Sequence, residues 1–162
     1  MTPDLVLRPA RIDEAELLTA IVRRSKASHG YDDAFMELLI ADTVIAAEQI
    51  AAESMMVAEI EGRVVAFAHL MPIDRPDIIY LENLFVEPDI QNAGVGRALF
   101  NWAVAEAARK GYAWLEWDSD PNAAAFYEKM GGEQIAENES TIFPGRMIPK
   151  FRKPTRNQQD SK

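Results

Sequence analysis

One stretch of the chain has the composition of an anion-binding loop: Gln91-Asn92-Ala93-Gly94-Val95-Gly96-Arg97. Gly94 and Gly96 have no Cβ, so the main chain can turn tightly and several successive N–H groups can point at one bound group. An amphipathic segment follows, and the start of a helix adds unpaired N–H groups and the positive end of its dipole. With the charge of Arg97 close by, the stretch predicts a phosphate site. The same glycines also suit a loop that only begins a helix, so the surrounding sequence has to distinguish the two.

Two better-known phosphate loops do not match this stretch. A P-loop has Lys followed by Ser or Thr after its last glycine, whereas Arg97 and Ala98 stand here. A dinucleotide-binding loop needs a third small residue where this chain has Leu99. Glu116 and Asp118 do follow at roughly 20 residues, the distance expected of a ribose-binding acid. A nicotinamide-dependent oxidoreductase therefore remains one hypothesis.

Composition limits the other possibilities. The 162 residues are 48% hydrophobic and 27% charged, which suits one globular domain with a substantial core. The absence of cysteine excludes disulfides and Cys-based zinc sites. A net charge of −9 argues against nucleic acid as a partner. Because we find no secretory signal and no apolar run of membrane-spanning length, we expect a cytoplasmic protein without a membrane partner.

Capping signals and periodicity predict two or three helices in the amino-terminal part. Asp13 and Glu16 match a capping box for a helix whose buried stripe comprises Leu17, Leu18, Ile21 and Val22. Asp32 or Asp33 can cap a second helix. The run 43–53 contains no Gly or Pro, so the sequence leaves open whether it continues that helix or forms another.

The rest of the chain alternates strands and helices. Strands are expected at 55–60, 63–71, 78–86, 112–117, 134–136 and 146–151. Glu61-Gly62 predicts a hairpin turn between the first two of these strands. A helix is expected at 95–109, and Asp120 with Pro121 predicts the start of another. This order is that of a mixed α/β domain.

The residues around the glycine loop resemble those of the GNAT superfamily of N-acetyltransferases. The family's pattern of Gln or Arg, two residues, Gly, one residue and then Gly or Ala is met by residues 91–96. Upstream, Leu84-Phe85-Val86-Glu87-Pro88 is similar to the strand and proline that lead into that loop. Downstream, residues 122–131 are similar to the family's second motif, with Asn, Ala, an aromatic residue, Tyr and Gly in the expected order. The strong match runs from about residue 80 to residue 132.

The resemblance implies an α/β fold with a mixed, twisted sheet of six to seven strands flanked by about four helices. We therefore expect residues 1–151 to form a single acetyltransferase domain and residues 152–162 a flexible, basic tail. In such a fold the strands that end here at Val86 and Trp117 splay apart. The arm of the coenzyme then runs between them and uses the exposed main chain as a neighbouring strand would.

The cosubstrate that the resemblance implies is acetyl-coenzyme A, with no metal. The main chain of Leu84, Phe85 and Val86 is expected to bind the pantetheine arm. The pyrophosphate is expected on Gln91, Asn92, Ala93, Gly94, Val95, Gly96 and Arg97. Asn122 and Phe126 are expected to line the other side of the coenzyme.

Acetylation of an amine needs a neutral amine, a donor for the developing oxyanion and an acid for the departing thiolate. Glu82 is the candidate base, two residues before Leu84 on the same strand. Some family members have their acid two positions earlier, where this chain has Tyr80, so transfer through a water molecule and a purely structural Glu82 both stay open. Tyr127 is the candidate acid, and the N–H of Phe85 or Val86 can bind the thioester oxygen.

The acceptor side is less defined. His29, Tyr31, Phe35 and Arg146 are candidates for lining the acceptor groove. His29 and His69 are the only histidines and neither has a partner at metal-ligand spacing, so no metal site is expected and His69 is interpreted as packing. We predict transfer of acetyl to a primary amine of a small molecule or peptide by direct attack in a ternary complex. The alternative is a non-catalytic acyl-coenzyme A-binding sensor or interaction module, and a homodimer would fit the family's habit.

Overall fold

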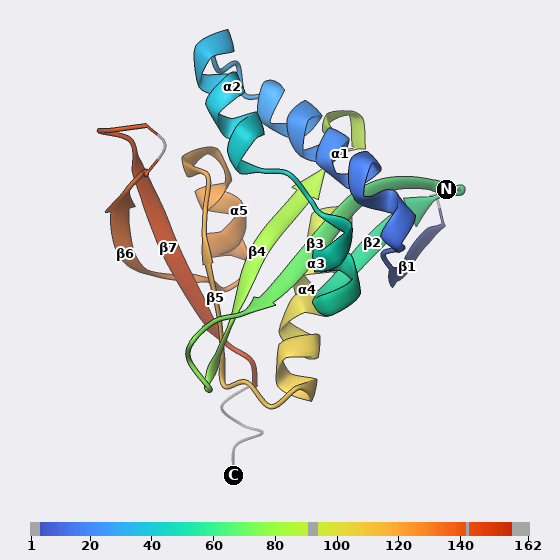
Figure 1. The fold of residues 1–162 in the computed structure, drawn as a ribbon. Coiled ribbons are helices and arrows are strands. Elements are labelled where there is room, and N and C mark those ends of the chain that lie inside the picture. Colours follow the sequence, from blue (N-terminus) through green and yellow to red (C-terminus); the bar gives the residue numbers. More distant parts are fainter. Residues whose placement is uncertain (1–3, 91–93, 142, 157–162) are drawn as a thin grey trace. The chain divides into compact units, whose positions relative to one another are not determined.

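A computed structural model describes residues 4–90, 94–141 and 143–156. In these ranges the chain forms seven strands and five helices (Figure 1). The strands are β1 (Leu5–Pro9), β2 (Ser54–Ile60), β3 (Arg63–Pro72), β4 (Ile78–Val86), β5 (Trp114–Asp118), β6 (Glu133–Glu139) and β7 (Met147–Pro154). The helices are α1 (Ala15–Ala27), α2 (Asp33–Asp42), α3 (Ala47–Ala52), α4 (Val95–Arg109) and α5 (Ala124–Lys129).

The strands form a mixed sheet in the order β1-β2-β3-β4-β5-β7-β6. β4 and β5 are parallel, and α4 lies between them in the sequence as the crossover that parallel neighbours require. β1 pairs antiparallel with β2, and β7 pairs antiparallel with both β5 and β6. The α/β class and the mixed sheet expected from the sequence are confirmed, with seven strands and with five helices where about four were expected.

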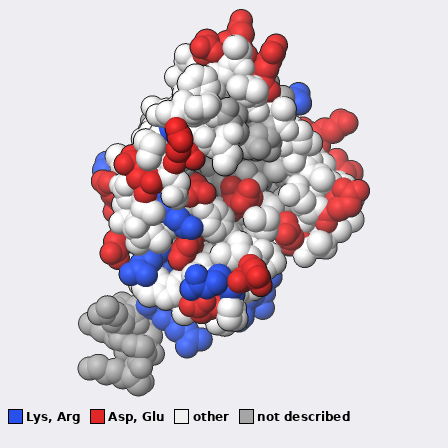
Figure 2. All heavy atoms as spheres, turned by 60° about the vertical axis from the view of Figure 1, so that its left-hand side comes forward, with Lys and Arg blue, Asp and Glu red and all other residues white. Residues whose placement is uncertain are grey.

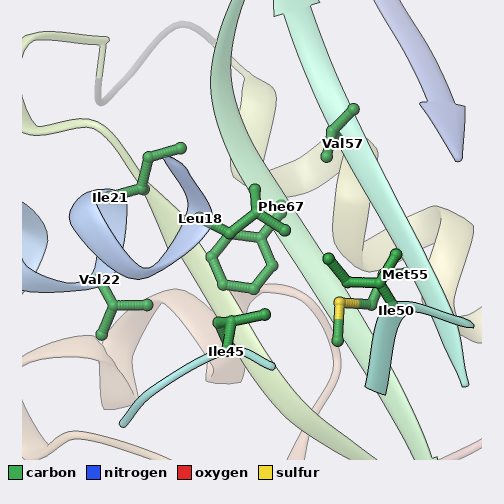
Figure 3. Packing of buried hydrophobic residues seen from close by; sticks show 8 residues of the cluster. All are labelled: Leu18, Ile21, Val22, Ile45, Ile50, Met55, Val57 and Phe67. Carbon is green, nitrogen blue, oxygen red and sulfur yellow. The ribbon is translucent and has the colours of Figure 1, made fainter. Parts of the chain in front are cut away.

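The chain divides into two compact units. The first contains Met1–His69 and Asn83–Leu99, and the second contains Leu70–Glu82 and Phe100–Lys162. In the first unit, α1 packs its apolar face on the strands β2 and β3, with α3 and the residues before it closing the edge (Figure 3). The buried side chains there are Leu18, Ile21, Val22, Ile45, Ile50, Met55, Val57 and Phe67.

Aromatic rings form the core of the second unit. The indole of Trp117 on β5 lies parallel to the ring of Phe151 on β7, with centroids 5.9 Å apart, and edge-on to the ring of Phe100 on α4 at 5.1 Å. All three side chains are fully buried. They anchor α4 and β7 to β5, because large buried rings contribute most to the area removed from water.

The start of the first helix differs from the predicted capping box of Asp13 and Glu16. The chain enters through a 3₁₀ turn at Ile12–Glu14, and the N–H of Arg11 donates to Glu14 at 2.8 Å. Arg8 stabilises the Glu14 carboxylate at the start of the helix, because its guanidinium donates two hydrogen bonds of 2.9 and 2.7 Å to that carboxylate. These contacts lower the pKa of Glu14. The contact of Glu14 with Arg8 on β1 therefore determined the start of the helix, and the predicted capping box of Asp13 and Glu16 was wrong.

The predicted buried stripe of α1 is confirmed for Leu18, Ile21 and Val22, whereas Leu17 is 42% exposed. Leu17 lies one residue outside the i, i+3, i+4 series that faces the sheet. The sequence therefore identified the helix but assigned its apolar face one residue too widely.

Residues 43–53 do not continue the second helix. Asp32 caps α2 as predicted, accepting the N–H of Phe35 at 2.8 Å. α2 ends at Asp42 and α3 begins at Ala47. In the break, the N–H of Ile45 donates to the hydroxyl of Thr19 on α1 at 2.9 Å. This contact is distant in sequence, so no local signal could have placed the break.

Several strand boundaries differ from the predicted ones, and β6 extends over Glu133–Glu139 where residues 134–136 were expected. β5 begins at Trp114, two residues later than predicted, because Tyr112 still donates its N–H to Ala107 at the end of α4. β7 continues along β5 to Pro154, which pairs with Trp114. Residues 152–154, expected to start the tail, therefore belong to the sheet, while residues 157–162 lie outside the described ranges.

The predicted hairpin is confirmed by its turn. Glu61 and Gly62 connect β2 to β3 and have φ of +52° and +80°. Two successive residues with positive φ form the tight turn whose twist matches that of the two strands. Across the described ranges, no helix has both the length and the apolar character needed to cross a bilayer.

Candidate active site

The predicted phosphate loop leads directly into α4. Gly94 has φ of +78°, a left-handed conformation that residues with a Cβ rarely adopt, and its carbonyl accepts the N–H of Ala98 at 3.1 Å. The N–H groups of Val95, Gly96 and Arg97 precede this hydrogen bond and belong to the positive end of the helix. Gly94 and Arg97 are exposed. The remaining predicted loop residues, Gln91, Asn92 and Ala93, lie outside the described residues.

The parallel pairing of β4 with β5 ends early. In the described part of the chain the paired residues are Ile78 with Trp114, Ile79 with Leu115 and Tyr80 with Glu116. β4 nevertheless continues to Val86 and β5 to Asp118. Peptide groups that leave a ladder in this way are able to pair with an added extended chain. The pairing of β4 with β5 therefore covers Ile78–Tyr80 and not the later residues of β4.

The second half of β4 lies in the first unit and is held by its odd-numbered side chains. The ring of Phe85 lies 6.1 Å from that of Phe67 and 5.6 Å from the ammonium of Lys26. Glu87 is buried at the end of the strand and accepts two hydrogen bonds of 2.8 Å from the guanidinium of Arg24. Arg63 approaches the same carboxylate at 3.4 Å. The predicted cofactor residues Leu84, Phe85 and Val86 are each half-buried.

Tyr127 lies among the rings of the second unit. Its side chain is buried, and its ring centroid is 5.2 Å from Trp117 and 5.1 Å from Phe126. Burial, followed by the negative charge of Asp120, raises the pKa of the Tyr127 phenol well above its usual value. The hydroxyl is therefore protonated at neutral pH, as it is in an exposed tyrosine.

Gly132, the residue after the second motif, makes room for this arrangement. A Cβ there would lie 2.8 Å from the ring of Trp117 and 2.9 Å from the carbonyl oxygen of Tyr127. Both distances are shorter than normal contacts. The glycine is required because the indole that supports Tyr127 occupies the space of a side chain.

A polar cluster connects β4, β5 and β7 in the second unit. Burial and a hydrogen bond to Asp118 raise the pKa of Tyr80, so the phenol stays protonated and donates to that carboxylate. Glu82 also contributes to this rise through its negative charge. The ammonium of Lys150 lies 5.6 Å from the ring of Tyr80 and 3.6 Å from Glu116. The candidate base is thus exposed and close to a tyrosine and further carboxylates.

Asn122 and Arg146 meet at Asp120. The carboxylate of Asp120 accepts the main-chain N–H and the side-chain amide of Asn122, each at 2.8 Å, and pairs with Arg146 at 3.2 Å. Asp120 therefore caps the turn that leads into α5, as predicted, and also holds two predicted site residues. Arg146 belongs to the second unit.

The other three acceptor candidates form a series of rings in the first unit. The centroids of His29 and Tyr31 are 5.9 Å apart, and those of Tyr31 and Phe35 are 4.7 Å apart in an edge-to-face contact. Phe35 is buried. These rings join the end of α1 to the start of α2.

Charge is unevenly spread on the face drawn in Figure 2, where acidic side chains are scattered widely and most Lys and Arg side chains lie in the lower part. Within the described ranges, no group of three or more His, Cys, Asp or Glu residues is arranged to hold a metal ion.

Three contacts at this site were not predicted from the sequence: Tyr80 with Asp118, Asn83 with His69, and Glu87 with Arg24. A signal did exist for the last two, since Asn83 and Glu87 are polar residues in or beside a strand predicted to be buried. Buried polar groups need partners, but the sequence does not say which.

Comparison with known proteins identifies the family. The model of the acetyltransferase (GNAT) family matches residues 17–132, well over half of the chain. The chain therefore belongs to this family. The expectation of an N-acetyltransferase that depends on acetyl-coenzyme A is confirmed at this level.

A curated relative is also an N-acetyltransferase. An uncharacterised N-acetyltransferase of Methanocaldococcus jannaschii is 29% identical over 90 residues, which are 51% of this chain and 40% of that protein. The match thus covers less than half of the relative's length.

Solved structures extend the likeness over nearly the whole chain. A GCN5-related N-acetyltransferase from Rhodopseudomonas palustris is 26% identical with a TM-score of 0.75, covering 95% of this chain and 96% of its own. The PaiA N-acetyltransferase of Thermoplasma acidophilum, solved in complex with coenzyme A, has the same fold with a TM-score of 0.76 and 17% identity. It covers 93% of this chain and 99% of its own.

Proposed function

We propose that this protein transfers an acetyl group from acetyl-coenzyme A to a primary amine of a small molecule or peptide, by direct attack in a ternary complex. The observation that carries the proposal is the start of α4, where the left-handed Gly94 leads into a helix whose first N–H groups precede the first helical hydrogen bond, in a chain that matches the acetyltransferase (GNAT) family. Tyr127, on the helix of the family's second motif, is the phenol proposed as proton donor.

Acetyl-coenzyme A fits the residues present. The N–H groups of residues 95–97 and the charge of Arg97 suit the pyrophosphate, together with the preceding residues Gln91, Asn92 and Ala93. The main chain of Leu84, Phe85 and Val86 suits the two amides of pantetheine, and Asn122 and Phe126 are proposed to contact the coenzyme as well.

The chemistry requires three roles of the protein: a base, a donor to the oxyanion and an acid. The amine nitrogen attacks the thioester carbon and forms the C–N bond, while Glu82 accepts a proton from the amine directly or through water. The N–H of Phe85 or Val86 stabilises the negative oxygen of the tetrahedral intermediate. The C–S bond then breaks, and Tyr127 gives its proton to the sulfur. The products are the N-acetylated amine and coenzyme A with a free thiol.

A cationic acceptor is favoured by the charges near the candidate base. Glu82 and Asp118 both act on Tyr80, and the chain as a whole is acidic. Negative charge raises the local concentration of a protonated amine and disfavours nucleic acid. His29, Tyr31, Phe35 and Arg146 are proposed to contact the part of the acceptor beyond its amine.

The proposal is tested by measuring thiol release from acetyl-coenzyme A over a panel of primary amines that includes diamines, amino acid amides and short peptides. At least one amine should stimulate release and appear in acetylated form by mass spectrometry. Tight coenzyme binding without stimulation by any amine would favour the sensor instead. Preferential binding of NAD(P)H would favour the oxidoreductase.

Substitution of Gly94 separates charge from strain in the loop. Gly94→Asp places a carboxylate beside the N–H groups proposed for the pyrophosphate, so coenzyme A binding measured by calorimetry should fall by at least about tenfold. Gly94→Asn is the matched control, because it has the same shape, tolerates positive φ and carries no charge. Equal affinities of the two variants would remove the loop from the phosphate site.

For Glu82, the pH profile is the informative measurement. If Glu82 accepts the amine proton, Glu82→Gln should lower kcat/KM, most strongly on the acidic side, where the amine arrives protonated. Coenzyme affinity should stay within a small factor of the parent. Glu137→Gln, an exposed carboxylate on β6, is the control and should leave the profile unchanged. A parental profile for Glu82→Gln would show that the residue is structural.

Tyr127→Phe removes one hydroxyl and keeps the ring contacts with Trp117 and Phe126. Folding and coenzyme affinity should therefore persist, while kcat should fall on the order of 10²-fold, or less because a thiolate leaves easily. Tyr112→Phe serves as the control. The acid role would be excluded by a Tyr127→Phe enzyme that stays within about twofold of the parent kcat when chemistry limits the rate.

A further inference from the structure

A buried chain of three polar side chains lies beside the candidate base. Asn83, the neighbour of Glu82 on β4, contacts Nδ1 of His69 on β3 through its side-chain nitrogen at 3.1 Å. Nε2 of His69 lies 2.8 Å from a carboxylate oxygen of Glu53, the residue after α3. His69 is fully buried, Asn83 is 9% exposed, and the Glu53 side chain is 19% exposed. The roles proposed above leave all three groups unused.

The contacts define the protonation of the imidazole. An amide nitrogen is a donor, so Nδ1 of His69 must be the acceptor and the ring proton must sit on Nε2. Nε2–H then donates to Glu53. Burial lowers the pKa of His69, and the hydrogen bond to Glu53 opposes this without reversing it. The result is a neutral ring fixed in one tautomer and one orientation.

The hydrogen-bonded side chains of Asn83, His69 and Glu53 lie next to the part of β4 that follows its pairing with β5. Pairing with β5 ends at Tyr80, so the later residues of β4 keep β3 as the neighbouring strand but are not paired with β5. In this part of the strand the side chain of Asn83 is hydrogen-bonded to His69. A further side-chain contact is at Glu87, where Arg24 and Arg63 bind the carboxylate. Asn83 and Glu87 thus bracket the three residues proposed to bind the pantetheine arm.

We propose that Asn83, held by His69 and Glu53, is a positioning residue that fixes the orientation of β4 between the candidate base and the coenzyme-binding main chain. The inference rests on the proposed function, because it assigns a purpose to the fixed strand. It differs from ordinary stabilisation in what it predicts: loss of Asn83 should misplace the reacting groups even in protein that remains folded. A misplacement of about 1 Å costs up to about 10²-fold in rate.

Histidine ¹⁵N NMR tests the contact independently of any activity. The chain has two histidines, and His29 in the turn after α1 provides an exposed reference that should exchange between tautomers. His69 should show the neutral Nε2–H tautomer in the parent, and a mixed or altered tautomer in Asn83→Ala. A parental His69 signal in Asn83→Ala, or an Nδ1–H tautomer in the parent, would overturn the proposed hydrogen bonds from Asn83 through His69 to Glu53.

Kinetics and coenzyme binding test the positioning role. Asn83→Ala and His69→Leu should each weaken coenzyme A binding about tenfold and lower kcat by about ten- to a hundredfold with the best amine of the panel. His69→Gln, which keeps one acceptor and one donor, should restore most of both losses. Thr19→Val is the matched control: it removes a buried hydrogen bond to Ile45 in the same unit and should keep parental affinity and kcat.

The outcomes separate the two proposals. A parent that binds no coenzyme A or acetylates no amine contradicts the proposed function itself. A parent that is active, with Asn83→Ala within twofold of it in both affinity and kcat, overturns the positioning role. Equal losses in Asn83→Ala and Thr19→Val would also overturn it, because they would show that Asn83 contributes only to the stability of the fold.

Discussion

Strand β4 has to keep its conformation beyond Tyr80, where its pairing with β5 ends in the described part of the chain. A strand without one of its neighbours loses the hydrogen bonds that define its twist and leaves peptide groups available to a ligand. The protein compensates with buried polar side chains: Asn83 binds His69, and Glu87 binds Arg24 and Arg63. These side-chain contacts hold β4 in place, while its peptide groups on the side of β5 can pair with a ligand.

The titratable groups near the site are tuned to different tasks by their surroundings. Burial among aromatic rings raises the pKa of Tyr127, so this phenol is protonated at neutral pH and is a weaker acid than an exposed tyrosine. Tyr80 is protonated too, but its proton is directed to Asp118, so this tyrosine organises the acidic cluster. The exposed Glu82 remains in contact with solvent, which suits exchange of a proton with an arriving amine.

The sequence predicted the parts of the fold that depend on local chemistry. The turn at Glu61 and Gly62, helix α4 and the cap at Asp120 follow from backbone conformation, periodicity and side-chain reach within a few residues. Two details depended on contacts outside the local pattern. Arg8 on β1 moved the first helical turn from the predicted capping box of Asp13 and Glu16 to Glu14, and Thr19 stabilises the break before α3, which the sequence had left open. Such contacts exist only once the chain has folded.

The same division applies to the site. The glycine loop and the motif around Tyr127 could be found because each is a short, dense pattern with a mechanism. The hydrogen bonds of Tyr80 and Asn83 could not, since they join strands that are far apart along the chain. Acceptor specificity is of this second kind, because it depends on side chains brought together from several segments.

Amide hydrogen exchange with and without coenzyme A tests the central role of β4 most directly. Saturating coenzyme A should slow exchange at the main chain of residues 84–86 and at residues 94–97, with little change in β1 and β6. Protection confined to other elements, or unchanged exchange at residues 84–86 despite tight binding, would contradict the claim that the part of β4 beyond its pairing with β5 receives the coenzyme.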